Sequence, residues 1–140
     1  MQEKINQIKE ALKLIGELKA KFNVQANKDG MESLIFAGVT VSNVITQLTP
    51  EVEKTFGKAY KPAGKWAFFM NFFDSFVKGV GGIRTDQTLF RKDIGPGLTL
   101  YCAFWPWGSN PVKTSIRIGL LCDTEEIEAQ MEKALAGSFR

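Results

Sequence analysis

The side chains of this sequence that come closest to a catalytic arrangement are its paired carboxylates. The pairs are Glu51 with Glu53 and Glu125 with Glu126. Acid–base catalysis needs groups that converge in space, but both pairs lie where the start of a helix favours acidic residues. The chain contains no histidine, so a serine or cysteine nucleophile would lack an imidazole base. We therefore expect that the protein is not an enzyme.

The sequence also gives little support for a metal or cofactor site. Cys102 and Cys122 lack CxxC spacing, and without histidine a zinc site has too few ligands. The glycine-rich run GVGGIR follows an expected helix rather than a strand, which does not fit a dinucleotide-binding fingerprint. We expect two buried, reduced thiols, no metal and no cofactor.

Aromatic residues around one loop form the first candidate binding surface. Trp105 and Trp107 flank Pro106 between two expected strands, and large rings in a loop lose burial unless something covers them. They either close the end of the sheet or contact a partner. With Tyr101 on the strand before them and Arg117 on the neighbouring strand, they form the partner-binding surface that we favour.

A row of lysines forms the second candidate surface. Lys54, Lys58, Lys61 and Lys65 are not interrupted by acidic residues and lead into Trp66 and the Phe-rich segment KWAFFMNFFDSFVKG, residues 65–79. Lysines attract anionic headgroups while aromatic rings enter the membrane interface. The alternatives are peripheral membrane or lipid binding, and a solvated lysine face beside an ordinary core helix.

Several amphipathic helices are expected to position these residues. Residues 3–22 place apolar side chains at three- and four-residue steps. Residues 31–48 have mixed periodicity, and we favour a helix there over a strand. A helix should begin at Thr49 with Pro50 in its first turn and run to Tyr60, with its lysines on one face. Residues 65–79 read as one helix with a wide apolar arc, and Asp123 or Thr124 should cap a further helix whose first turn carries Glu125 and Glu126.

Strand patterns occupy the part of the chain between the last two helices. Residues 85–93 are compatible with a short strand, whereas 98–105 and 113–122 alternate strictly and should form an antiparallel hairpin. Folding about residues 106–111 sets Cys102 opposite residues 114–116, too far from Cys122 for a disulfide. We therefore predict an α+β fold, with four to five helices packed on one face of a small antiparallel sheet of about three strands.

Composition and length limit the remaining possibilities. A chain of 140 residues, 44% hydrophobic and 24% charged, is typical of a single globular domain, here residues 1–140. The first 21 residues contain frequent charges and no apolar core of a secretory signal. We expect a cytoplasmic protein, with attachment to a membrane as the alternative.

Taken together, these features favour a non-catalytic protein-interaction module that binds a protein partner or self-associates. The alternative is a peripheral membrane or lipid-binding protein that contacts an anionic membrane surface or an apolar ligand. Nucleic-acid binding ranks third, because a net charge of +3 is mild and no stacking-sheet motif or major-groove helix is identifiable.

Overall fold

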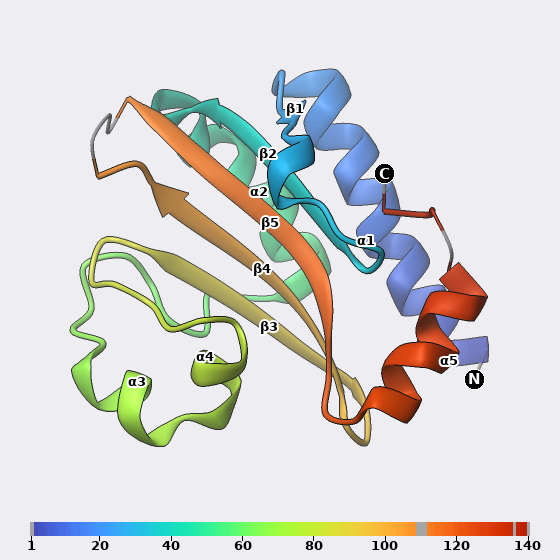
Figure 1. Ribbon diagram of the computed structural model, residues 1–140. Coiled ribbons are helices and arrows are strands. Elements are labelled where there is room, and N and C mark those ends of the chain that lie inside the picture. Colours follow the sequence, from blue (N-terminus) through green and yellow to red (C-terminus); the bar gives the residue numbers. More distant parts are fainter. Residues whose placement is uncertain (1, 109–111, 136, 140) are drawn as a thin grey trace.

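One antiparallel sheet organises the molecule, with its strands in the order β1-β2-β5-β4-β3 (Figure 1). The computed structural model describes residues 2–108, 112–135 and 137–139. The strands are β1 (Gln25–Ala26), β2 (Ile35–Val41), β3 (Thr88–Gly95), β4 (Leu98–Pro106) and β5 (Lys113–Cys122). The helices are α1 (Gln2–Lys21), α2 (Ile45–Phe56), α3 (Phe68–Phe73), α4 (Ser75–Gly79) and α5 (Glu125–Leu135), with 3-10 turns at Lys28–Gly30 and Ser42–Val44.

The α+β class is confirmed, but the sheet has five strands rather than about three. The expected helix over residues 31–48 is wrong for its first half, which is strand β2. Ala37 of β2 pairs with Arg117 of β5, a partner 80 positions away in the chain. Gly38 lies where an added Cβ would come within 2.7 Å of Val24, so the neighbouring segment crosses β2 closely. Such distant pairing leaves little trace in local periodicity.

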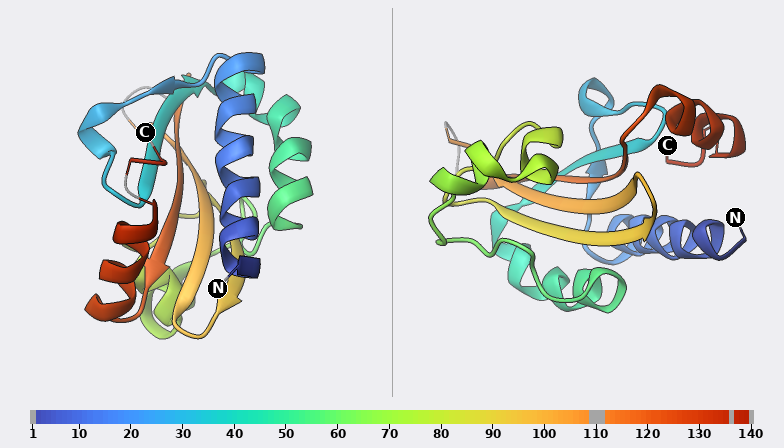
Figure 2. Two further views of the ribbon diagram at one scale, coloured as in Figure 1. Left: turned by 90° about the vertical axis from the view of Figure 1, so that its right-hand side faces the viewer. Right: turned by 90° about the horizontal axis from the view of Figure 1, so that it is seen from below.

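Helices α1 and α2 cover one face of the sheet, and the main core lies between them (Figure 2). The stripe predicted for residues 3–22 supplies fully buried Ile8 and Leu18. Every second residue of β4 and β5 packs against this stripe from the sheet side of the core. Met131 and Leu135 of helix α5 join the same core.

Helix α2 differs from the prediction at both ends. It begins at Ile45 and includes Pro50, while the Thr49 hydroxyl donates a hydrogen bond to the Ile45 carbonyl at 2.6 Å. It ends at Phe56, because the next residue, Gly57, has a φ of 80° that L side chains rarely adopt. The lysines after Phe56 therefore do not continue its face.

The β4–β5 hairpin is confirmed, with a register shifted from the expected one. Cys102 pairs with Ile118 and Cys122 with Leu98, so the two cysteines lie at different heights of the hairpin. Both thiols are free, but the expectation that both are buried holds only for Cys102, because Cys122 is half-buried.

Candidate functional site

The segment between α2 and β3, residues 57–87, forms a lobe on the second face of the sheet (Figures 1 and 2). We call it the aromatic lobe. The single helix expected over residues 65–79 is divided here into α3 and α4. The break lies at Asp74, whose backbone is extended and whose carboxylate accepts hydrogen bonds from the Phe76 and Val77 amides at 2.9 and 3.1 Å. Asp74 therefore ends one helix and caps the next.

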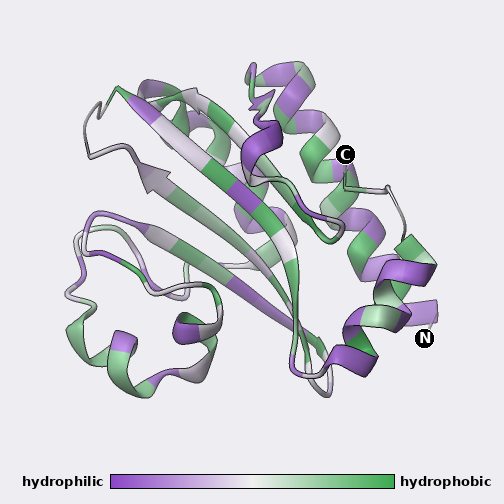
Figure 3. Ribbon diagram, in the orientation of Figure 1, coloured by the Kyte–Doolittle hydropathy of each residue, from purple (hydrophilic) through white to green (hydrophobic). Residues whose placement is uncertain are grey.

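The lobe presents most of its aromatic side chains to solvent. The ribbon of α3 is coloured largely hydrophobic although this helix lies at the surface of the molecule (Figure 3). Within the lobe, Ala67 is buried and the Asn71 side chain points inward. The exposed fractions are 64% for Trp66, 50% for Phe68, 58% for Phe69, 58% for Phe72 and 81% for Phe73. We call these five side chains the aromatic platform.

The rings of the platform contact one another and form a continuous surface. The ring centroids of Trp66 and Phe68 lie 5.5 Å apart, those of Phe68 and Phe72 lie 5.1 Å apart, and those of Phe69 and Phe73 lie 6.3 Å apart. Scattered apolar side chains on a surface are ordinary, whereas a contiguous exposed group indicates an interaction site.

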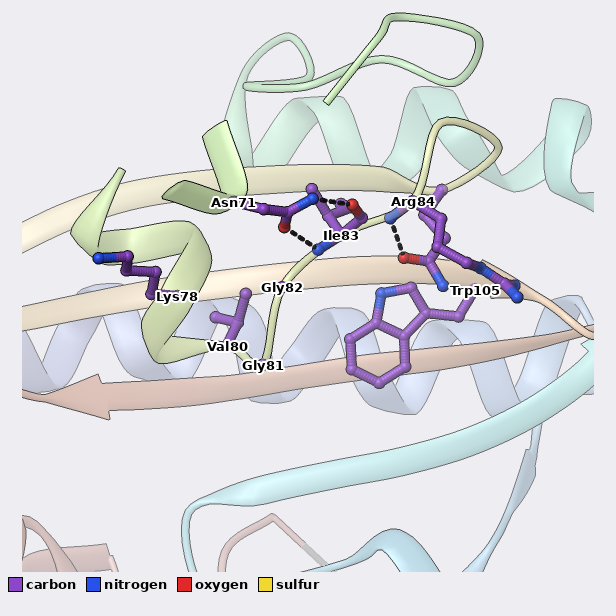
Figure 4. A pocket seen from close by; sticks show the side chains of 9 residues that line it. Asn71, Lys78, Val80, Gly81, Gly82, Ile83, Arg84 and Trp105 are labelled. Carbon is purple, nitrogen blue, oxygen red and sulfur yellow. Dashed lines mark hydrogen bonds between the residues drawn. The ribbon is translucent and has the colours of Figure 1, made fainter. Parts of the chain in front are cut away.

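Asn71 ties the platform helix to the chain that follows it. Its side-chain amide donates to the Ile83 carbonyl and accepts from the Ile83 amide, both at 2.7 Å (Figure 4). The Asn71 side chain thus forms with the Ile83 backbone the same pair of hydrogen bonds that a residue of a neighbouring strand would form. This pairing fixes which side of α3 faces solvent.

Lys61 ties the base of the lobe to the sheet. Its side chain is fully buried and donates to the carbonyls of Arg84, Thr85 and Gln87 at 2.8, 2.7 and 2.7 Å. Its backbone pairs with Leu89 of β3. Burial lowers the pKa of the Lys61 ammonium, with the nearby Asp86 acting in the opposite direction.

A polar and aromatic cluster closes the lobe near β3. The Tyr60 hydroxyl donates to Asp74, and this hydrogen bond is the main cause of the raised pKa of Tyr60. The Arg91 guanidinium lies 5.4 Å from the Tyr60 ring centroid and 4.7 Å from that of Phe76. The platform therefore stands on a base that is hydrogen-bonded and packed, with Phe76 and Val77 buried against the sheet.

The predicted lysine row is only partly brought together. Lys54 remains on α2, paired with Glu51 at 3.1 Å, whereas Lys58 and Lys65 are exposed on the lobe beside exposed Trp66. The expectation that Lys61 shares a helical face with Lys54 and Lys58 is wrong, because α2 ends before both later lysines and Lys61 is buried.

The net charge of the lobe can be counted from the sequence, but the predicted lysine row contains only some of the basic residues of the lobe. Residues 57–87 contain five basic and two acidic residues, a net charge of +3. The whole chain, with 18 basic and 15 acidic residues, has the same net charge, so the remainder is balanced. Lys78 and Arg84, both exposed, are the basic residues that lie outside the predicted row.

The predicted partner surface is divided by the lobe. Tyr101 is only 4% exposed and packs beneath Phe76 and Val77, so the expectation that helices cover one face of the sheet is wrong. Trp105, Trp107 and Arg117 remain together on the open half of that face, each half-buried.

Two cations lie over the two indoles of this open half. The Arg117 guanidinium is 4.9 Å from the Trp105 ring centroid, and the Lys113 ammonium is 5.4 Å from that of Trp107. The Trp107 indole N–H donates to the Ser115 hydroxyl at 2.8 Å. Trp107 therefore rests on the end of the sheet rather than extending from a free loop.

A hollow of 740 Å³ separates the lobe from this open half (Figure 4). We call it the Trp105 hollow. The Gly81–Arg84 segment forms one side and the Trp105 ring another, with Lys78 at its margin. The Trp105 indole N–H is buried and has no hydrogen-bond partner among the described residues.

Other kinds of site were sought over the same part of the chain. Among residues 2–108, 112–135 and 137–139, no group of three His, Cys, Asp or Glu side chains is placed to hold a metal ion. No helix formed by these residues is long and apolar enough to cross a bilayer. Comparison with known proteins gives no match to a protein family, to a curated protein or to a solved structure.

Proposed function

We propose that the protein is a peripheral membrane-binding module that rests its aromatic platform in the interfacial region of a lipid bilayer. The observation that carries this proposal is the joint exposure of five neighbouring aromatic side chains on one lobe. Aromatic rings favour the boundary between headgroups and acyl chains, where an apolar face is buried without crossing the bilayer.

The way the lobe is held supports a binding role for the platform. An ordinary core helix would turn its phenylalanines inward and Asn71 outward. Here the Asn71 amide is committed to Ile83, and the buried Lys61 fixes the base of the lobe. A contact surface that is held in place before binding loses little conformational entropy when it binds.

Charge supports a membrane rather than an uncharged apolar partner. The aromatic lobe has a net charge of +3, and Lys58, Lys65 and Lys78 are exposed on it. Basic side chains near a bilayer that contains anionic lipids contribute about 1 kcal/mol each. The platform and its surrounding charges therefore suit the same kind of surface.

The test is flotation with vesicles of phosphatidylcholine and phosphatidylserine. Replacing Phe69 and Phe73 by serine should weaken binding more than about tenfold, since each buried ring contributes about 1.5–3 kcal/mol when fully inserted. A matched control replaces Val41 and Val112, which are exposed apolar residues outside the lobe. Equal binding by both double variants, or no flotation of the unmodified protein, would contradict the proposal.

A second candidate function is self-association through Trp105, Trp107 and Arg117. It is favoured by two tryptophans on the open half of the sheet, each with a cation over its ring. Replacing Trp105 and Trp107 by alanine should shift the sedimentation coefficient of an oligomer to that of a monomer and retain the circular dichroism spectrum. A concentration-independent monomer before substitution excludes this candidate.

A further inference from the structure

The Trp105 hollow joins features that suit an anionic ligand. Its charged lining residues are Lys78 and Arg84, and its lining contains no carboxylate as far as the structure describes it. Both cations belong to the lobe that carries the platform. A solvent-filled depression with positive charge and no acidic residue concentrates anions.

The two cations retain donors for a ligand. Lys78 is exposed and forms no ion pair within the described part of the chain. Arg84 uses Nε towards Asp86 at 3.5 Å and Nη2 towards the Pro106 carbonyl at 2.9 Å, which orients the guanidinium and leaves Nη1. An oriented guanidinium is suited to phosphate oxygens.

The wall of the hollow contains a hydrogen-bond donor without an acceptor. The Trp105 indole N–H lies at the ring edge facing the segment with Gly82 and Ile83 (Figure 4). A buried donor without a partner destabilises a fold by about 1–3 kcal/mol. Because the N–H has almost no exposed surface, a ligand oxygen reaches it only when the atoms around it shift.

The position of the hollow relates it to the platform. Asn71 of α3 and Lys78 of α4 both line it, and these are the helices of the platform lobe. When aromatic rings enter the interface, lipid phosphates lie in the headgroup layer beside the same lobe.

We propose that the Trp105 hollow binds the phosphate group of a lipid headgroup, with Lys78 and Arg84 as its cationic contacts and the Trp105 N–H as a further donor. This inference rests on the proposed membrane-binding function. The chemistry recognised is a phosphate monoester, and its alternative source is a soluble phosphate compound.

The first experiment separates a built site from diffuse charge. Vesicles containing phosphatidic acid, whose headgroup is a phosphate monoester, are compared with phosphatidylserine vesicles of equal surface charge. Lys78→Gln with Arg84→Gln should remove a preference of about tenfold for phosphatidic acid. Lys58→Gln with Lys65→Gln removes the same charge from the lobe outside the hollow, and should weaken binding to both lipids alike. Equal effects of the two pairs would overturn the proposal.

The second experiment identifies the source of the phosphate and keeps the two proposals separable. Glycerol 3-phosphate is titrated by isothermal titration calorimetry into the unmodified protein and into Trp105→Phe, which removes the indole N–H. Saturable binding of glycerol 3-phosphate that is lost in the double variant Lys78→Gln, Arg84→Gln supports the site, with a soluble compound as its ligand. This result stands even if flotation of the Phe69→Ser, Phe73→Ser variant contradicts membrane binding by the platform. The phosphate site is overturned if the protein neither binds glycerol 3-phosphate nor prefers phosphatidic acid over phosphatidylserine. The membrane-binding role of the platform is tested separately, by flotation.

Discussion

Lys61 places a positive charge where a side chain has no contact with solvent. Burial of an ammonium group is unfavourable unless its donors are satisfied, and here three carbonyls accept them. Those carbonyls belong to the segment between α4 and β3. The Lys61 side chain therefore holds this segment in place with hydrogen bonds that a neighbouring strand would otherwise supply. The position of the lobe therefore depends on Lys61, a residue that the sequence suggests is part of an exposed basic surface.

Lys61→Met should destabilise the protein by about 3 kcal/mol or more, because it retains most of the apolar stem and leaves three carbonyls unpaired. Urea denaturation measures the change in the free energy of unfolding. Lys58→Met, at an exposed position in the same segment, should change it by no more than about 0.5 kcal/mol. Similar values for the two variants would show that the buried hydrogen bonds contribute nothing.

The pH dependence of stability can be assigned to a second residue beneath the lobe. Burial raises the pKa of Tyr101 to about 12, whereas an unfolded tyrosine has a pKa of about 10. The folded state therefore keeps a proton that the unfolded state releases, and the free energy of unfolding falls as pH rises through this interval. The loss amounts to about 2–3 kcal/mol at the upper end, at 1.36 kcal/mol per pKa unit.

Urea denaturation between pH 9 and pH 12 tests this assignment. Tyr101→Phe should reduce the slope of stability against pH by the contribution of this residue. An unchanged slope would assign the whole pH dependence to other groups with raised pKa values, such as the thiol of buried Cys102.

At the scale of elements, prediction succeeded where periodicity alone decides the structure. The stripe of α1, the alternation of β4 and β5, and the acidic start of α5 are local patterns, and these elements formed as predicted. Strand β2 was misread because its partner β5 lies far along the chain.

The aromatic lobe was misread for a different reason. The sequence pattern treats residues 65–79 as one helix, whereas the chain is divided at Asp74 and the aromatic side chains from Trp66 to Phe73 face solvent. Asn71 and Asp74 are held by specific hydrogen bonds that no periodicity records. Trp66, Lys58 and Lys65 of the proposed membrane-binding surface were identified from the sequence. Lys78 and Arg84, which line the Trp105 hollow, would have required a charge count over the whole segment.

Asn71→Leu tests whether this amide sets the orientation of α3. The substitution keeps the approximate volume and removes both hydrogen bonds to Ile83. We expect a loss of about 1–3 kcal/mol, seen as faster amide hydrogen exchange within residues 68–83. Asn43→Leu, at an exposed position after β2, is the matched control and should leave exchange in the lobe unchanged. Protection retained in Asn71→Leu would assign the orientation to ring packing alone.

At the scale of the whole molecule, charge and exposed apolar surface occur on the same lobe. The remaining residues balance their charges, so a negatively charged surface attracts the protein lobe first. The helices on the opposite face of the sheet bury their apolar stripes in the main core. Under the proposed function, the lobe is the side of the molecule that would attach to a membrane.

Binding to anionic vesicles should therefore weaken about tenfold or more as salt rises from about 0.1 M to about 1 M, where the screening length falls from about 10 Å to about 3 Å. Binding to phosphatidylcholine alone, if driven by the aromatic platform, should change little over the same range. Flotation at each salt concentration measures both. Salt-independent binding to anionic vesicles would remove the electrostatic part of the proposal.

The covered edges of the sheet limit how copies of this chain can aggregate. Lys61 forms two backbone hydrogen bonds with Leu89 on the outer edge strand β3, and that strand continues with charged Arg91 and Lys92. The other edge strand, β1, has only two residues. Short, bridged or charged edges discourage the strand-to-strand addition that produces amyloid fibrils. The exposed aromatic side chains lie on helix α3 and its flank, whereas the unpaired backbone groups lie on the edge strands. Because the two features are on different elements, the exposed apolar surface does not promote strand-to-strand fibril growth.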